Sequence, residues 1–284
     1  VPNFKKLNEG LKIAMTSGYI GIYQQESLIG IANLTSLLSY LIIPAVLFLL
    51  AGSKNEHGQI KKTNLIVAII STVLYTMTGF FIGNRSGPVL FLLAFAWVWH
   101  KTVKAIPKTV LLSLGGILLF IVFPAIAILR SNAGEERFTI NSLWNAFTSL
   151  DNPFVATLNE MGMSMSTITY TMNLIPTVRS YDFGEGYLLA LTTIFPNLFW
   201  EIHPAVERGK FANWLIWNID PITARNGGGI GYSYIAEAYA NFGYLGAPIV
   251  IFIFGILIVR LFLWAELRND NRKIAMLGSF LAFL

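Results

Sequence analysis

The sequence predicts an all-α, polytopic integral membrane protein, and three observations support this class. Hydrophobic residues make up 55% of the chain. Charged residues make up 12%, about half the share that is usual in a soluble globular protein. Several uncharged stretches approach or exceed the roughly 20 apolar residues that a helix needs to cross a bilayer. The chain also has no cysteine, which excludes disulfides and thiolate metal sites.

We expect one membrane domain over residues 1–284, as part of a longer protein. The sequence has no initiating methionine, and it ends inside an apolar run at residues 274–284. Further helices are therefore expected beyond one or both ends.

The first half of the chain alternates apolar spans with basic loops. Residues 28–52 carry no charge and form the first predicted span, and residues 63–82 form the second. A single helix over residues 63–99 would be about 55 Å long, against a hydrocarbon core of about 30 Å. A break is therefore required between residues 82 and 99.

Residues 83–88 are the expected position of that break. A glycine ends a helix well, Ser86 can cap the next helix, and Pro88 suits its first turn. The following run to Trp99 is short for a full crossing, so we expect it to be tilted, re-entrant or sunk into the protein.

The second half begins with a predicted span at residues 109–129, after which more than a hundred residues lack a clean span. We interpret residues 130–237 as a large outer-face loop region that contains the active site. Its apolar segments are an amphipathic surface helix, a Ser-, Thr- and Met-rich stretch that can form a polar-lined span, and a short run broken by proline: residues 140–150, 161–178 and 187–200. A further span is predicted at residues 238–259, and a basic loop at residues 260–273.

The distribution of basic residues predicts the orientation. The loops at residues 53–62, 100–108 and 260–273 carry ten basic residues against three acids. They are predicted to be cytoplasmic by the positive-inside rule. The outer region at residues 130–237 has ten acids, one lysine and five arginines, and Arg85 adds a sixth arginine on that side.

Outer-face arginines with almost no lysine indicate recognition of an anion, because a guanidinium matches phosphate and carboxylate groups in a bidentate manner. Arg85 lies beside a predicted helix N-terminus, itself an anion site, and Arg130 lies at the end of a span. The alternative is that each arginine pairs with a nearby acid or snorkels at the interface. The outer arginines are Arg85, Arg130, Arg137, Arg179, Arg208 and Arg225.

Residues 223–246 (TARNGGGIGYSYIAEAYANFGYLG) form the most informative stretch. Its glycines, which include Gly229 and Gly231, can take positive φ and let the backbone approach a ligand. Ser233 is a plausible N-cap. Glu237 and Asn241 follow it at i+4 and i+8, so the three share one helical face. A polar stripe next to a span favours a wet cavity or a partner, although a glycine hinge before an ordinary helix would give the same pattern.

The sequence lacks a P-loop, HExxH and GxSxG motifs, and an outer-face DxD pair. With three histidines in the chain, a multi-histidine metal site is not expected. We therefore predict chemistry without metal or cofactor, in which arginine supplies the positive charge that a phosphate leaving group needs.

Four segments resemble the Wzy-type oligosaccharide repeat unit (O-antigen) polymerases. They are FFIGNRSGPVL, the region from Asn152-Pro153-Phe154 to Tyr181-Asp182-Phe183-Gly184, TTIFPNLFW, and GGGIGYSYIAEAYANFGYLG. The resemblance covers roughly residues 80–260, and the last segment is the most specific. At Asn197 the family often has a basic residue, so no role is transferred to that position.

The resemblance implies an all-helical bacterial plasma-membrane enzyme of the GT-C type, working on the outer face. Such enzymes transfer a glycan from one undecaprenyl diphosphate carrier onto a repeat unit held on another. The implied partners are these lipid-linked oligosaccharides, the bilayer and a chain-length regulator protein, with no nucleic acid. The positions that match the family pattern are Arg85, Gly231, Ser233, Glu237, Asn241 and Gly243.

Roles follow from the needs of glycosyl transfer. We predict that Glu237, or else His203, activates the acceptor hydroxyl. Arg85 is predicted to be catalytic through stabilisation of the leaving diphosphate. Glu237 could instead only pair with Arg225 and hold the loop. The predicted diphosphate and substrate ligands are Arg130, Arg179, Arg208, Arg225, Gly229, Gly231, Tyr232, Ser233 and Asn241. Candidate sugar-stacking residues, which could equally be interfacial aromatics, are Trp144, Tyr181, Trp200, Trp214, Trp217 and Tyr232.

Two other classes stay open. A related GT-C enzyme could ligate the glycan to a different acceptor, as an O-antigen ligase does. A flippase for lipid-linked sugar would show charge along a path through the spans, whereas here the unpaired charge gathers on the outer face.

Overall fold

The computed structural model describes residues 41–54, 59–82, 86–122, 148, 153–192, 207–225, 228–267 and 270–283. The regular elements among these residues are helices, with no strand apart from one isolated bridge between Lys54 and Ile60. The chain divides into two compact units, which are described separately. One comprises residues 1–157 and 260–284, and the other residues 158–259.

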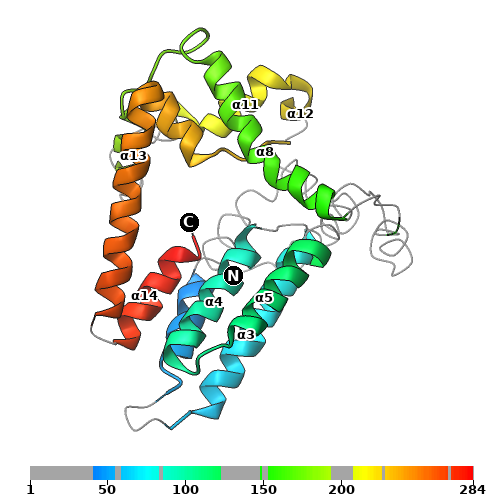
Figure 1. Ribbon diagram of the computed structural model, residues 1–284, viewed down its shortest axis with the longest axis vertical. Coiled ribbons are helices and arrows are strands. Elements are labelled where there is room, and N and C mark those ends of the chain that lie inside the picture. The colour runs from blue at the N-terminus through cyan, green and yellow to red at the C-terminus, as the bar shows by residue number, and fades with distance from the viewer. Residues whose placement is uncertain are drawn as a thin grey trace, which may run out of the picture. The chain divides into compact units, whose positions relative to one another are not determined.

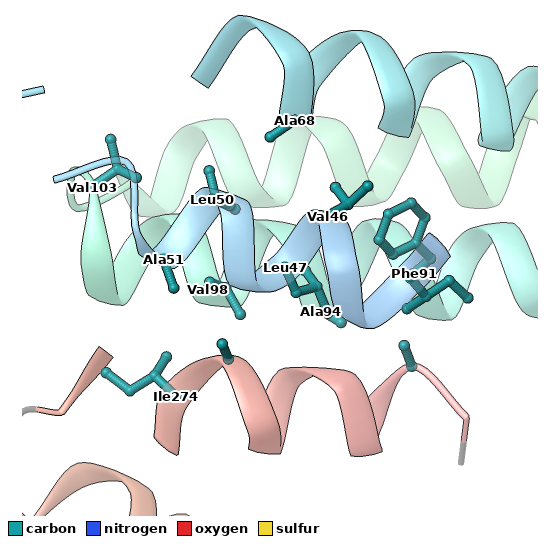
Figure 2. Close-up of a cluster of buried hydrophobic side chains, with 13 residues drawn as sticks. Val46, Leu47, Leu50, Ala51, Ala68, Phe91, Ala94, Val98, Val103 and Ile274 are labelled. Atoms are coloured by element: carbon teal, nitrogen blue, oxygen red, sulfur yellow. The ribbon is translucent and has the colours of Figure 1, made fainter. Parts of the chain in front are cut away.

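The first unit is a helical bundle around one apolar core (Figure 1). Its elements are a helix at Leu41–Ala51, α3 at Lys62–Ile82, α4 at Ser86–Thr102, α5 at Lys108–Ile117 with a π-helical continuation at Leu118–Val122, and α14 at Asn271–Leu281. Figure 2 shows side chains from four of these helices meeting in the core, among them Leu47, Ala68, Phe91 and Ile274. In a membrane, where lipid tails are as apolar as these side chains, such contacts stabilise the bundle through van der Waals packing.

The predicted break after residue 82 is confirmed. Helix α3 ends at Ile82 and α4 begins at Ser86, which places Pro88 in the first turn of the new helix. Gly79 leaves room for the ring of Pro88, since a Cβ at that position would overlap the proline. The two helices pack against each other, with the ring of Tyr75 edge-on to Phe91 at 5.2 Å between centroids.

Three basic segments meet at one end of the first unit, the lower end in Figure 1, where α3 and α14 begin and α4 ends. Lys101 of α4 forms an ion pair of 2.8 Å with Glu266. The side chain of Asn271 donates a hydrogen bond of 3.1 Å to the carbonyl of Ala51. The segments predicted to share the cytoplasmic side therefore lie together in this bundle.

The expected loop at residues 260–273 is wrong in detail. Residues 260–266 continue helix α13, and residues 271–273 already belong to α14. Charged side chains suit a helix end as well as a loop, since Lys, Arg and Glu are good helix formers. The loop between α4 and α5 is likewise shorter than expected, because α4 continues to Thr102.

The second unit contains most of α8 (Pro153–Leu174), the short helices α9 (Glu185–Thr192), α11 (Phe211–Ile219) and α12 (Pro221–Arg225), and the first part of α13 (Tyr234–Glu266). Ile175, Phe211, Tyr239 and Ala240 form its core. In α8, the hydroxyls of Thr167 and Thr171 bond to carbonyls of the preceding turn, so both are buried without loss of pairing.

Two of the described helices are long and apolar enough to cross a membrane, namely the Lys62–Phe80 part of α3 and the 33-residue α13. The latter extends the predicted span at residues 238–259 in both directions. Helix α13 is interrupted at Gly243, whose φ of 67° and ψ of −163° are not helical. The part beyond this kink, from Tyr244 to Glu266, is about 34 Å long and so exceeds a hydrocarbon core of about 30 Å.

Several predictions fall outside the described residues. They are the first part of the span at residues 28–52, the end of the span at residues 109–129, nearly all of the amphipathic segment at residues 140–150, and the end of the run at residues 187–200.

Candidate functional site

A cluster of charged side chains in the second unit is centred on Asp182. Arg179 donates two hydrogen bonds of 3.1 Å to its carboxylate, from Nε to Oδ1 and from Nη2 to Oδ2. Nη2 of Arg208 forms an ion pair with Oδ2 of the same carboxylate. The Asp182 side chain is only 6% exposed. Two guanidinium groups thus share one buried carboxylate, which leaves the trio with a net positive charge.

The kink at Gly243 explains how Asp182 is held in place. A break in a helix leaves carbonyl groups without their usual partners four residues further on. The backbone N–H groups of Asp182 and Phe183 donate to two such carbonyls, those of Ala240 and Asn241, at 3.1 and 3.0 Å. The loop before α9 is therefore fastened to the end of the first segment of α13.

Arg208 has unused hydrogen-bonding capacity. Its Nε atom is buried and has no hydrogen-bond partner in the described part of the chain, while Nη2 is ion-paired with Asp182. The guanidinium carbon lies 4.6 Å from the centroid of the Phe211 ring. Gly186 of α9 leaves room for the group, because a Cβ there would lie 2.9 Å from Nη2.

Burial lowers the pKa of Arg208, and the like charge of Arg179 lowers it further, while the charges of Glu237 and Tyr232 act in the opposite direction. An arginine stays protonated despite such shifts. Arg208 is therefore a partly desolvated cation with a free donor at Nε, which is the chemistry that binds a phosphate or another anion.

Glu237 lies on the first segment of α13, as the predicted polar stripe requires. Ser233 caps the helix, since its Oγ accepts a hydrogen bond of 3.2 Å from the N–H of Ile235. The N–H of Glu237 donates to the Ser233 carbonyl at 3.0 Å, and the Asn241 side chain donates to the Glu237 carbonyl at 2.8 Å. The predicted N-cap at Ser233 is confirmed, and the backbone and side-chain bonds join Ser233, Glu237 and Asn241 along the same helical segment, as their spacing predicted.

Arg208 is the cation whose charge acts on the half-buried Glu237. The charge of Glu237 in turn raises the pKa values of Arg208, Tyr187 and Tyr232, which places the carboxylate within electrostatic reach of all three. The alternative pairing of Glu237 with Arg225 is not found among the described residues, and Arg225 is exposed at the end of α12.

Tyr232 is fixed by both its ring and its hydroxyl. Its ring stacks on Phe211 at 5.3 Å, with an interplanar angle of 7°. Its hydroxyl lies 2.9 Å from Oγ1 of Thr171. Because Thr171 donates its own hydrogen to the Thr167 carbonyl, Tyr232 is the donor of this bond, and its oxygen lone pairs remain available as acceptors. Burial raises the pKa of Tyr232 to about 12, so the hydroxyl is neutral at physiological pH.

The structure brings together six of the predicted site residues: Arg179, Arg208, Tyr232, Ser233, Glu237 and Asn241. Gly229 and Gly231 precede this helix, and a Cβ on either would meet no neighbour. Arg85, Arg130 and His203 lie outside the described residues, so their roles stay predictions.

The described glycines of the glycine-rich loop do not use the positive φ that glycine permits. Positive φ among the described glycines occurs at Gly184, Gly209 and Gly243, not in the loop at residues 228–231. Gly228 instead allows two backbone segments to approach closely. Its N–H donates to the Thr223 carbonyl at 2.9 Å, and a Cβ at this position would crowd the Thr223 side chain. Spacing shows where glycines lie but not which backbone conformation each adopts.

Three residues of the site were not predicted as site residues: Asp182, Thr171 and Tyr187. Asp182 follows Arg179 by three positions, and that spacing could have indicated a local ion pair. Tyr187 stacks on Phe242 at 6.3 Å, and its hydroxyl is buried without a partner in the described part of the chain. No local pattern marks Thr171, because its partner Tyr232 is 61 residues away.

The candidate sugar-stacking aromatics differ in accessibility. Trp217 on α11 is 50% exposed. Trp214 is partly buried, and the guanidinium carbon of Arg179 lies 5.5 Å from the centroid of its ring. Tyr181 is edge-on to Tyr239 at 6.0 Å, and one face of Tyr232 is covered by Phe211. Among these, Trp217 is best placed to present a ring face, while Trp144 and Trp200 lie outside the described residues.

Within the described ranges, no group of three or more His, Asp or Glu side chains is arranged to hold a metal ion. The cluster instead combines a cation with a free donor, a carboxylate and tyrosine hydroxyls. This combination can stabilise a departing anion and accept a proton.

Comparison with known proteins identifies the family. A family model described as O-antigen polysaccharide polymerase Wzy matches residues 1–284, the whole chain. No curated protein and no solved structure matches it. Of the three functional classes that the sequence left open, the family match selects the polymerase. The chain therefore belongs to the Wzy family of O-antigen polysaccharide polymerases.

Proposed function

We infer that this chain is a GT-C-type glycosyltransferase that transfers a glycan from one undecaprenyl diphosphate carrier onto a repeat unit held on another. Membership of the Wzy family assigns it the coarser activity, polymerisation of lipid-linked repeat units in the inner membrane. The proposal adds the carrier, the outer-face orientation, and a reaction that needs no metal.

The observation that carries the proposal is that Arg208 is ion-paired with Asp182, whose backbone N–H bonds to the Ala240 carbonyl, one turn beyond Glu237 on α13. In the proposed reaction, an acceptor hydroxyl oxygen attacks C1 of the donor sugar. The bond from C1 to the phosphate oxygen breaks, and the diphosphate leaves with the electron pair. Arg208 stabilises the diphosphate through its free donor. Glu237 takes the proton of the acceptor hydroxyl.

Neighbouring residues suit the same reaction. The free lone pairs of Tyr232 can accept a hydrogen bond from a sugar hydroxyl, and the exposed ring of Trp217 can stack on a sugar. Gly229 and Gly231 border the site with open space around them, which would let a substrate approach the backbone. Arg85 and Arg130 are proposed as further diphosphate ligands, and His203 as the alternative base.

The grouping of basic segments at one end of the first unit supports a cytoplasmic location for that end. The arginine-rich segment at residues 130–237 would then face the periplasm or cell exterior. The proposal also keeps a chain-length regulator protein as a partner.

Polymerisation by the purified full chain from lipid-linked repeat units tests these roles. Arg208→Lys keeps the charge but loses the planar fork, so kcat should fall by about 10²-fold or more. Glu237→Gln removes the base, and kcat should fall by about 10²- to 10⁴-fold while substrate still binds. Glu185→Gln is the control, because Glu185 is an exposed acid at the start of α9. Near wild-type chain growth by both Arg208→Lys and Glu237→Gln would disprove the assignment.

A further inference from the structure

We propose that Asp182 is a positioning residue: held by Arg179, it aims the free Nε donor of Arg208 at the diphosphate, and Arg179 itself does not contact the substrate. This inference rests on the proposed function, because it takes Arg208 as the diphosphate ligand.

The two arginines differ in how their donors are used. Arg179 directs both Nε and Nη2 at the Asp182 carboxylate, in the bidentate arrangement that fixes a carboxylate most firmly. Its guanidinium also lies 4.8 Å from the centroid of the Phe211 ring. Arg208 contacts Asp182 only through Nη2, and its Nε has no partner among the described residues. The geometry therefore assigns Arg179 to Asp182 and leaves Arg208 for a ligand.

Asp182 also sets the place of Arg208 relative to Glu237. The backbone N–H of Asp182 is bonded to the carbonyl of Ala240, one turn beyond Glu237 on the same helix. The Asp182 carboxylate is thus fixed to the helix that carries the proposed base. Through Asp182, the position of Arg208 is fixed relative to that of Glu237. Transfer between two bound substrates needs such a fixed arrangement of the group that binds the diphosphate and the base.

Electrostatics gives a second reason for a carboxylate at this position. The charge of Arg179 lowers the pKa of Arg208, which shows that the two cations repel each other. Asp182 is 6% exposed and contacts both, so it offsets that repulsion where water cannot. Without it, Arg208 would be free to move away from Arg179 and from its position beside Gly186.

Two substitutions on the full-length protein disturb this arrangement by different routes. Asp182→Asn removes the shared charge. Gly186→Ala places a Cβ against the Arg208 guanidinium, which is the flexible end of a side chain, and leaves Asp182 and Arg179 intact. Their matched controls are Asp220→Asn, where asparagine is an equally good helix cap, and Gly162→Ala, where a Cβ on α8 meets no neighbour.

The readouts are kcat and KM for a lipid-linked repeat unit, the inhibition constant of inorganic pyrophosphate, and the melting temperature. A displaced ligand of the diphosphate should lower kcat/KM by about 10²-fold and weaken pyrophosphate inhibition. We expect this for Asp182→Asn, with partial recovery in Asp182→Glu. Gly186→Ala should show the same kinetic defect at an unchanged melting temperature, and both controls should behave as wild type.

Arg179→Gln tests whether Arg179 acts on Arg208 through Asp182. If Arg179 works through Asp182, adding Arg179→Gln to Asp182→Asn should cause no further loss, because residues that act as one unit are not additive. If Asp182→Asn does not fold, Arg179→Gln alone should still weaken pyrophosphate inhibition less than Arg208→Gln does.

The inference is overturned if Asp182→Asn and Gly186→Ala keep wild-type kcat/KM and pyrophosphate inhibition while Arg208→Gln is inactive. It is also overturned if Arg179→Gln weakens pyrophosphate inhibition as much as Arg208→Gln does. An active Arg208→Gln would instead disprove the proposed function itself, so the two failures are distinguishable.

Discussion

Asn241 and Gly184 are 57 residues apart in the chain and are joined by a hydrogen bond of 2.9 Å, from the Gly184 N–H to the Asn241 side-chain oxygen. The amide nitrogen of the same side chain donates to the carbonyl of Glu237. Asn241 is fully buried. Both polar atoms of this side chain are thus committed within the protein, which supports a structural role in place of the predicted role in substrate binding.

Asn241→Ala should destabilise the protein by about 1–3 kcal/mol, because it removes a fully buried side chain and leaves the partly buried N–H of Gly184 without its partner. Asn218→Ala is a close control. The Asn218 amide also donates to a carbonyl four residues earlier, that of Trp214, but it is exposed, so the cost should stay within about 0.5 kcal/mol. Thermal unfolding of the detergent-purified variants measures both. Equal melting temperatures for the two would contradict the structural role of Asn241.

Gly243→Ala should destabilise the second unit by about 1–3 kcal/mol. Gly243 has a φ of 67°, where a Cβ is strained, and that Cβ would also lie 3.4 Å from the ring of Tyr181. Gly255→Ala in the same helix has open space and helical geometry, so it should be neutral or stabilising. If Gly243→Ala is as stable as Gly255→Ala, the helix does not need the kink.

Stability should fall as the pH rises from about 10 to about 12. Burial raises the pKa values of Tyr187 and Tyr232 to about 12 in the folded protein. In the unfolded chain tyrosine ionises near pH 10. The unfolded state therefore releases protons first, and the slope of unfolding free energy against pH is negative in this window. The contribution is complete below pH 10.

The apparent melting temperature measured between pH 8 and pH 12 checks this dependence. The double variant Tyr187→Phe/Tyr232→Phe should show a shallower decline than the wild type. An identical decline in both proteins would mean that other groups control alkaline unfolding.

Polymerisation should survive EDTA. Of the carboxylates that could serve as metal ligands in the region predicted to face outwards, Asp182 is held by two arginines, and Asp220 accepts hydrogen bonds from the N–H and hydroxyl of Thr223 at 3.0 and 2.6 Å. Asp151 lies outside the described residues. Turnover of lipid-linked repeat units by purified protein with and without EDTA is the measurement. Loss of activity that Mg²⁺ or Mn²⁺ restores would show a metal requirement.

Single cysteines should label asymmetrically, and the chain offers a clean background because it has no cysteine. Lys104→Cys lies between α4 and α5, at the basic end of the first unit, and should be protected from an impermeant maleimide in intact cells. Asn84→Cys and Glu185→Cys should react. Reaction of Lys104→Cys from outside would reverse the orientation and remove the site from the outer face.

The sequence predicted those parts of the fold that depend on neighbouring residues. The break after Ile82 followed from helix length and from the residues around Pro88, and the cap at Ser233 followed from residue type and position. The break and the cap both depend on residues close in the chain, and such local preferences can be predicted from a single sequence.

The parts that were missed depend on contacts between distant segments or on the conformation of a single residue. The sharing of Asp182 by Arg208 needs segments 26 residues apart in the chain to meet, and no local pattern indicates it. The kink at Gly243 could not be inferred, because a glycine within an apolar run is compatible with a continuous helix.

The kink at Gly243 also has a mechanical consequence. A helix longer than the local bilayer is thick adapts by tilting. In an unbroken 33-residue rod, such a tilt would carry Glu237 with it. Here the first segment of α13 is fastened to residues 182–184, and the hydrogen-bond ladder is interrupted just beyond it. We therefore expect a tilt of the apolar part in a membrane to be taken up at Gly243, with the spacing of Glu237 and Arg208 unchanged in membranes of different thickness.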